Sequence, residues 1–302
     1  MRTNLISRIT LFSILYLALA AGILEKHGIA RAADLSAVRV AVSDGIFAHP
    51  HDLILSRDGR FLYIADNGND AIKVLDPNTL KTLGAFGQSQ LSRPHDVTLD
   101  GDGRLLVADS GNNRIAIFEI AGTMGRFIGE FSGGMASPEG VAWADGLVYV
   151  TNVGNGDLVV IKDGKEIRKT GSHGSAVGQF NRPHDVHVDG RGRILIADPG
   201  NNRVQILDQT LKVTSVLHGP PYLFQEPKYL TVDSLGRLFV ADEYSNLIKV
   251  IDRKGALVMT IGESDKEDEK LNQPEGVEVR GGSIWISDTY NNRILLYRLP
   301  GT

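Results

Sequence analysis

The chain of 302 residues contains no cysteine. This absence excludes disulfide bonds, thiolate metal ligands and a lipid-modified cysteine near the N-terminus. The sequence also lacks a Ser-His-Asp nucleophile motif, a phosphate-binding loop and a dinucleotide-binding fingerprint. It has no basic stripe, and its net charge is −4, so nucleic acid is not an expected partner. Because there are no disulfide bonds or thiolate-bound metals, stability must come from packing.

The N-terminal residues have the pattern of a secretory signal peptide. Arg2 and Arg8 precede an apolar stretch over 9–24, which is followed by Ala30-Arg31-Ala32. The stretch has 16 residues, which is short for a bilayer span of about 20. We predict a cleaved signal over 1–32, a secreted or periplasmic location and no stable membrane insertion after cleavage. An uncleaved anchor is the alternative.

Six copies of one pattern occupy the rest of the chain, 33–302. Each copy begins with a proline, and the spacings are 44, 44, 45, 44 and 47 residues. The six prolines are Pro50, Pro94, Pro138, Pro183, Pro227 and Pro274. A period in the forties with strand-forming content is typical of a β-propeller. The sequence therefore predicts an all-β fold of six blades with four antiparallel strands in each.

The fullest copies indicate where the strands lie. In one copy we expect strands over 96–100, 104–108, 114–119 and 125–131, separated by glycine-containing turns. The equivalent ranges in another copy are 185–189, 193–197, 203–208 and 211–217.

The last copy has only three expected strands, over 276–279, 283–287 and 293–299. An alternating run over 37–42 has no partner in the first copy, so we predict that it completes the last blade. Closing the ring in this way removes exposed sheet edges. The protein is expected to be a monomer.

The copies RPHDVTLDGDGRLLVADSGNNRIAIFE from Arg93 and RPHDVHVDGRGRILIADPGNNRVQILD from Arg182 closely resemble NHL repeats. The resemblance covers nearly all of 33–302 and implies a six-bladed propeller. NHL repeats build sensor domains, protein-interaction propellers and the lyase part of peptidylglycine α-amidating enzymes. The repeat by itself therefore implies architecture more strongly than function.

The residue after each repeat proline starts the innermost strand, so six side chains should surround one end of the central channel. They are His51, His95, Glu139, His184, Lys228 and Glu275, followed by Asp52, Asp96, Gly140, Asp185, Tyr229 and Gly276. Imidazoles on a rigid ring are good zinc ligands, and carboxylates suit calcium. The alternative is structural, with each Asp capping a turn and each His bonding a neighbouring blade.

The resemblance to the amidating lyase implies particular ligands. In that family, zinc is held by histidines at the Pro-His positions of alternate blades, and calcium lies lower in the channel. The corresponding residues here are His95, His184 and Glu275 for zinc, with His51 as an additional candidate, and Asp52, Asp96 and Asp185 for calcium. A glutamate in place of the third histidine is still an acceptable zinc ligand.

The catalytic residues of that family are only partly matched. Its tyrosine follows a Ser-Asp-Gly turn, but the blade in register carries Thr-Asn-Val-Gly over 151–154. Similar turns elsewhere present Tyr244 and Tyr290, and no blade has the family's substrate-binding arginine. Two functions remain open, namely a propeller that binds a peptide, glycan or protein on the histidine face, and a zinc-dependent carbon–nitrogen or carbon–oxygen lyase acting on a carbinolamide.

Three further features are predicted to be mainly structural. The arginines of the Asn-Asn-Arg motif each follow an aspartate by five residues, which predicts an ion pair within the blade; these pairs are Asp109–Arg114, Asp198–Arg203 and Asp288–Arg293. The acidic loop over 262–270 should lie at the same end as the histidines. The segment 218–224 either forms a pocket wall or packs against the fifth blade.

Overall fold

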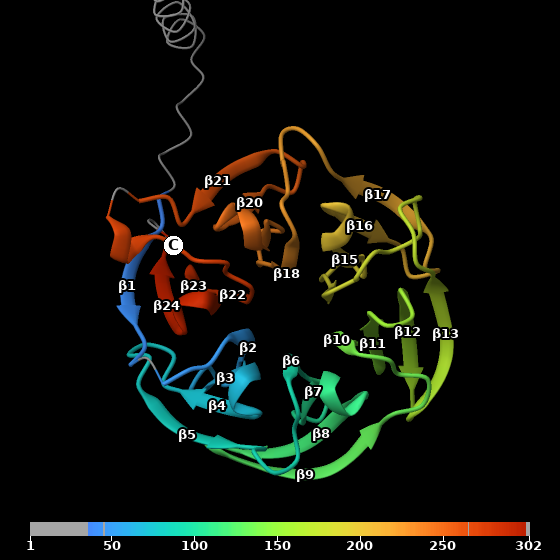
Figure 1. The fold of residues 1–302 in the computed structure, drawn as a ribbon, viewed down its shortest axis with the longest axis horizontal. Coiled ribbons are helices and arrows are strands. Elements are labelled where there is room, and N and C mark those ends of the chain that lie inside the picture. Colours follow the sequence, from blue (N-terminus) through green and yellow to red (C-terminus); the bar gives the residue numbers. More distant parts are fainter. Residues whose placement is uncertain (1–35, 45, 265, 300–302) are drawn as a thin grey trace, which may run out of the picture. The chain divides into compact units, whose positions relative to one another are not determined.

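The structure is a computed structural model that describes residues 36–44, 46–264 and 266–299. From residue 36 onward the chain forms six four-stranded antiparallel sheets arranged in a ring (Figure 1). The prediction of a six-bladed propeller is confirmed. The predicted signal over 1–32 lies outside the described residues. Within the described residues, no helix has the length and apolar character needed to cross a membrane.

The strands follow one order in every blade, from the channel outward. Blade one contains β2 (Pro50–Leu55), β3 (Leu62–Asp66), β4 (Ala71–Leu75) and β5 (Thr82–Phe86). Blade two contains β6 (Pro94–Leu99), β7 (Leu105–Asp109), β8 (Arg114–Ala121) and β9 (Met124–Phe131). Blade three contains β10 (Pro138–Ala144), β11 (Leu147–Asn152), β12 (Asp157–Lys162) and β13 (Lys165–Gly171).

The other three blades are built in the same way. Blade four contains β14 (Val186–Val188), β15 (Ile194–Asp198), β16 (Arg203–Leu207) and β17 (Val213–Leu217). Blade five contains β18 (Pro227–Val232), β19 (Leu238–Asp242), β20 (Leu247–Ile251) and β21 (Leu257–Ile261). Blade six contains β22 (Val277–Arg280), β23 (Ser283–Asp288), β24 (Arg293–Arg298) and β1 (Val38–Val42).

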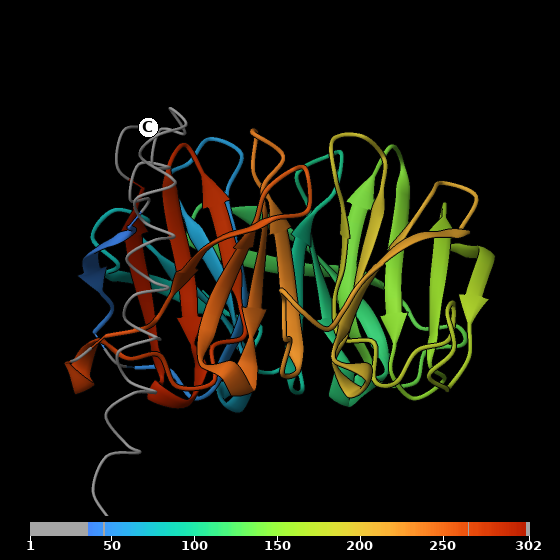
Figure 2. The same cartoon turned by 90° about the horizontal axis from the view of Figure 1, so that it is seen from above.

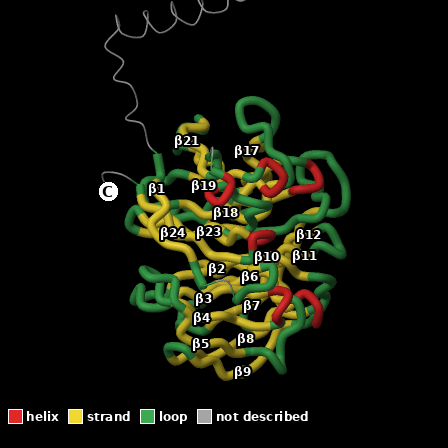
Figure 3. Tube along the Cα trace, turned by 60° about the vertical axis from the view of Figure 1, so that its left-hand side comes forward, coloured by secondary structure: helices red, strands yellow, loops and turns green. Residues whose placement is uncertain are grey.

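Short 3-10 helical turns join the second and third strands of most blades, and they appear as the small red segments in Figure 3. They are η1 (Asn67–Asn69), η2 (Ser110–Asn112), η3 (Pro199–Asn201), η4 (Glu243–Ser245) and η6 (Thr289–Asn291), while η5 (Glu267–Glu269) lies in the acidic loop before β22. Seen from the side, the strands stand upright, and loops and turns cover the two ends of the ring (Figure 2).

The ring closes where the two ends of the described chain meet. Strand β1 pairs antiparallel with β24, with Val38 opposite Arg298 and Val42 opposite Leu295. This pairing confirms the prediction that the N-terminal run completes the last blade. The indole of Trp285 in β23 also donates a hydrogen bond of 2.7 Å to the carbonyl of Pro77 in blade one. The sixth blade is thereby joined to the first.

The core consists of apolar layers between neighbouring blades. Side chains of blades four and five form one such layer, in which Val204 and Val240 are fully buried. The predicted segment 218–224 packs against blade five, because the Lys249 ammonium donates to the carbonyls of Tyr222 and Leu223. Burying apolar area in this way supplies most of the driving force for folding.

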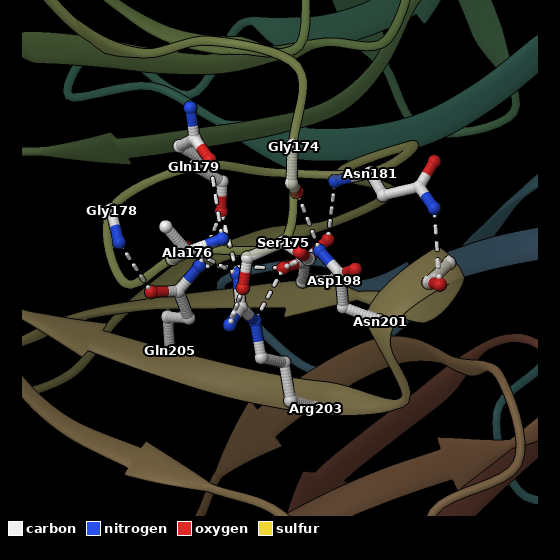
Figure 4. A network of polar contacts seen from close by, with 11 residues as sticks. Gly174, Ser175, Ala176, Gly178, Gln179, Asn181, Asp198, Asn201, Arg203 and Gln205 are labelled. Atoms are coloured by element: carbon white, nitrogen blue, oxygen red, sulfur yellow. Dashed lines mark hydrogen bonds and ion pairs between the residues drawn. The ribbon is translucent and has the colours of Figure 1, made fainter.

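The predicted arginine–aspartate pairs are all present within their blades. The guanidinium Nε lies 2.7 Å from the carboxylate in Asp109–Arg114 and Asp198–Arg203, and 2.6 Å in Asp288–Arg293. Figure 4 shows the pair in blade four, where Arg203 also donates to main-chain carbonyls of the loop before β14. Arg203 therefore joins Asp198 in blade four to the loop that leads from blade three into β14.

The residue before each repeat proline has a left-handed backbone. These residues are His49, Arg93, Ser137, Arg182, Glu226 and Gln273, with φ between 47° and 62°. This region is sparsely populated by residues other than glycine, so it needs support. For five of the six, the amide donates to a side-chain oxygen of the preceding blade, as in the 2.8 Å hydrogen bond from Ser137 N to Asn113 Oδ1. Each proline is thereby held at the inner edge of its blade.

Candidate metal centre

The residues that follow the repeat prolines meet at one end of the channel, as the repeat predicts. The ring centroids of His51 and His95 lie 4.5 Å apart, and those of His95 and His184 lie 5.6 Å apart. Nδ1 of His51 lies 3.1 Å from Oε2 of Glu275, and Nε2 of His184 lies 3.4 Å from Oε2 of Glu139. We call this end of the channel the mouth.

Two glycines allow the histidine-bearing strands to approach their neighbours. A Cβ on Gly276 would lie 2.4 Å from the carbonyl oxygen of His51, and one on Gly140 would lie 2.7 Å from that of His184. Either contact is closer than atoms can approach. The Thr151 hydroxyl also donates a 3.0 Å hydrogen bond to the carbonyl of His184. The backbone under the histidines is thus fixed by blades three and six.

Three imidazoles form a group with metal-ligand geometry. One ring nitrogen from each of His51, His95 and His184 lies within 4.8 Å of the other two. Within the described residues this is the one such group of three or more His, Cys, Asp or Glu side chains. Nδ1 of His95 and Nδ1 of His184 are buried and have no hydrogen-bond partner, and Nδ1 of His51 faces only the Glu275 carboxylate at 3.1 Å. Buried polar atoms are normally satisfied, so these unpartnered nitrogens are consistent with an ion.

The electrostatics of the mouth favour neutral imidazoles. Burial and then the charge of Lys228 lower the pKa of His51 to about 3, and burial also lowers the pKa of His95 and His184 well below the usual range. A neutral imidazole is the form that binds a metal. Three nitrogen ligands with one position left open are typical of catalytic zinc sites.

Carboxylates surround this group. Burial raises the pKa of Glu275 and of Glu139 to about 7, and the opposing charge of Lys228 limits both shifts. Oε2 of Glu275, which lies 3.1 Å from Nδ1 of His51, also lies 3.8 Å from Nε2 of His184. The Lys228 ammonium lies 3.3 Å from Oε2 of Glu243. Glu275 is therefore placed to act as a fourth ligand or to orient a histidine.

The three aspartates of the Pro-His-Asp motifs lie in the next layer of the channel. The Val141 amide donates to Asp96 Oδ2 at 2.6 Å, and the Leu230 amide donates to Asp185 Oδ2 at 2.7 Å. Asp52 and Asp185 both interact with Asp96, and burial raises the pKa of all three carboxyl groups. Asp96 and Asp185 therefore join neighbouring blades, whereas the structural alternative expected each Asp to cap its own turn. None of the three aspartates forms an ion pair among the described residues.

Tyr229 contacts two of the three histidines. Its hydroxyl donates a 3.0 Å hydrogen bond to the carbonyl of His95, and its ring meets that of His184 edge-on at 4.9 Å. The side chain is 1% exposed. The repeat places Tyr229 directly after the mouth residue Lys228, but the sequence did not indicate a role for it.

Below the aspartates, a recess of about 130 Å³ receives side chains from all six blades. It contains two titratable groups that the sequence analysis did not select, His187 and Glu278. His187 follows Asp185 by two positions, and Glu278 follows Gly276 by two positions. Because side chains two apart on a strand lie on the same side, this alternation could have placed both residues in the channel. Burial lowers the pKa of His187 to about 4 and raises the pKa of Glu278 to about 7.

Replacing Glu278 by glutamine is expected to stabilise the protein more at pH 8 than at pH 5. The folded pKa of about 7 exceeds the unfolded value of 4.5, so between these values the unfolded chain releases a proton that the folded protein retains. Glu278 therefore lowers the free energy of unfolding as pH rises. The advantage of Glu278→Gln should grow by about 2 kcal/mol over this range, measured by urea unfolding. Exposed Glu166→Gln should show no such trend, and equal gains at both pH values would contradict the prediction.

The two candidate catalytic tyrosines lie on the rim of the mouth. Tyr244 is 53% exposed and Tyr290 is 47% exposed, and the Tyr290 ring lies 5.1 Å from that of His49. Tyr244 belongs to the 3-10 turn η4 and Tyr290 to η6, and both turns lie at the histidine end of the ring. The structure therefore brings them to the same end as the histidines, but not into the three-histidine group.

Comparison with known protein families identifies the repeats. Residues 91–118 and 180–207 match the family profile described as NHL repeat. These segments span the second and fourth prolines, from which the histidines His95 and His184 follow. The chain therefore carries NHL repeats within a six-bladed propeller.

Individual relatives match only a short part of the chain. Over 39 residues, 13% of the chain, it is 51% identical to protein lin-41 of Caenorhabditis elegans and 44% identical to NHL repeat-containing protein 3 of Homo sapiens. These matches span 3% and 11% of those proteins. Among solved structures, a streptogramin B lyase superimposes with a TM-score of 0.62 at 14% identity, covering 88% of this chain and 97% of that one. This likeness concerns the fold alone.

Proposed function

We propose that this chain is an extracytoplasmic propeller that holds zinc at its channel mouth and binds a peptide, glycan or protein there. The observation that carries the proposal is the three-histidine group with its unpartnered buried nitrogens. The location is proposed from the composition of residues 1–32 alone.

His51, His95 and His184 would hold the zinc, with Glu275 beside them. Zinc prefers nitrogen ligands from neutral imidazoles, and the lowered pKa values keep all three in that form at neutral pH. Calcium is the second cation proposed, on Asp52, Asp96 and Asp185. These carboxylates are oxygen ligands without a basic partner among the described residues, which suits a hard cation.

The rim supports binding of a larger ligand above the metal. Tyr244 and Tyr290 are exposed aromatic side chains next to a polar, charged mouth. Tyrosines of this kind contribute large contact area with one polar atom each, and they are enriched at binding surfaces. NHL-repeat propellers also commonly serve as protein-interaction scaffolds, which favours a protein or peptide over a small ligand.

A zinc-dependent lyase is the second candidate, because an open metal centre with a neighbouring carboxylate and two rim tyrosines contains the parts of such a site. Bound zinc would polarise a ligand oxygen. Cleavage of a carbinolamide carbon–nitrogen bond would pass the hydroxyl proton to the phenolate of Tyr290 or Tyr244. The phenol so formed would give a proton to the leaving amide nitrogen, which yields an amide and an aldehyde. The streptogramin B lyase supports this reading only through its shared fold.

The proposal predicts about one equivalent of zinc per chain in residues 33–302 purified without added metal or a histidine tag. Elemental analysis after removal of weakly bound ions measures it, and the same sample reports calcium. Failure to retain a transition metal even after zinc is offered would overturn the metal centre. With zinc bound, turnover of an α-hydroxyglycine peptide would favour the lyase, and its absence would favour the binding protein.

A further inference from the structure

A second recess lies far from the histidines, at the seam between blades four and five. Its volume is about 220 Å³. It is bordered by Arg193, Gly236 and Gly255, which lie at or next to the turns β14–β15, β18–β19 and β20–β21. These turns follow the ends of strands that run away from the mouth, so the recess opens on the opposite end of the ring. Figure 1 shows the two blades side by side.

The floor of this recess is aliphatic. It consists of Leu195, Ile206, Leu217, Leu238 and Ile251. These side chains belong to the apolar layer between the two blades. The Tyr222 hydroxyl donates a 2.7 Å hydrogen bond to the carbonyl of Gly255, so its polar group is satisfied at the border of the recess. A ligand that enters here would exchange water for hydrocarbon contact.

The rim of the recess is rich in cations. Arg253 and Lys254 line it, and Nη2 of Arg191 reaches to 3.7 Å from the Cβ position of Gly236. None of the three forms an ion pair among the described residues. By contrast, the carboxylate of Asp189 lies 2.7 Å from Arg193, and that of Asp233 lies 2.7 Å from Arg237.

One carboxylate, that of Asp252, also lines the recess, and its charge attracts Lys254. The carboxylate of Asp252 accepts hydrogen bonds from the amides of Lys254 and Ala256 at 2.8 and 2.9 Å. The recess therefore combines an aliphatic floor with an excess of positive charge, in a chain whose net charge is −4. An arginine fork pairs well with a carboxylate, whereas a ligand ammonium would be repelled.

We propose that this recess binds an amphipathic carboxylate, a free fatty acid with a short acyl chain. The chain lies on the aliphatic floor, and the carboxylate contacts Arg253 and Lys254. Apolar pockets with a few well-placed charged groups at one edge are typical of small-molecule sites. The site is independent of the metal centre, which lies at the other end of the channel.

Octanoate is the probe, and titration calorimetry with residues 33–302 is the measurement. We expect saturable binding of one octanoate per chain and no binding of octylamine. The double variant Arg253→Glu/Lys254→Glu removes the head-group contacts, and Ser215→Trp fills the space for the chain. Each should weaken binding at least about tenfold. Lys162→Glu, an exposed change at the end of β12 in blade three on the same face, should leave binding unchanged.

Four outcomes would overturn the proposal. These are no saturable binding to the folded wild-type protein, equal binding of octylamine, binding that survives both recess variants, and binding only to vesicles of anionic lipid. The last outcome would assign the cations to a membrane surface. Because both recess variants change exposed side chains, their folding can be verified by unchanged thermal unfolding.

Discussion

Replacing His184 by alanine is expected to weaken zinc binding by more than about a hundredfold. Loss of an outer-shell partner of a metal site already costs roughly 10–100-fold in affinity, and loss of a ligand should exceed that. His184 is the member of the three-histidine group that is most enclosed, between Glu139, Glu275 and the ring of Tyr229. Competition against a chromophoric chelator at pH 7.5 measures the affinity.

The matched control is His187→Ala, which removes a half-buried histidine three residues further along the same blade. His187 lies in the lower recess, and its imidazole is absent from the three-histidine group. Zinc affinity should therefore be unchanged in this variant, while its loss of packing resembles that of His184→Ala. Equal zinc affinity in both variants would contradict the assignment of the ligands. Circular dichroism on both proteins verifies that the fold is retained.

The position of the mouth residues follows from the repeat itself. A nearly constant spacing places each Pro-X pair at the same radius and height of the ring, so His51, His95 and His184 had to converge. The ion pair Asp198–Arg203 follows in the same way, because residues that pair across the turn recur in several blades.

Features that break the repeat could not be obtained in this way. Tyr229 occupies a position held by Asp or Gly in the other blades, and only the distance across the channel determines that its hydroxyl reaches the carbonyl of His95. The grouping of His51 with His95 and His184 likewise depends on side-chain directions. The resemblance implied alternate blades, whereas the group comes from blades one, two and four. The recess between blades four and five depends on how two blades pack, which no local pattern encodes.

Replacing Asp198 by alanine is expected to lower the free energy of unfolding by about 3–5 kcal/mol. Its side chain is fully buried and accepts hydrogen bonds from the amide of Asn181, the side chain of Asn201 and Nε of Arg203, at 2.7, 2.9 and 2.7 Å. Removing one partner of a buried pair leaves the other charge uncompensated, which costs roughly this amount. Urea unfolding monitored by fluorescence measures the change.

Blade three offers the matched comparison, because its equivalent residue is Asn152 and no arginine faces it. Asn152 accepts from the Ala136 amide at 2.6 Å and donates to the carbonyl of Gly134 at 3.0 Å, and its side chain also hydrogen-bonds the Asp157 carboxylate. The turn is thus held without a buried arginine. Asn152→Ala should therefore cost only about 1–2 kcal/mol. The difference between the two variants measures the penalty of leaving Arg203 buried without its carboxylate. If both variants cost the same, the carboxylate in blade four acts only as a hydrogen-bond acceptor, and the ion pair does not stabilise the blade.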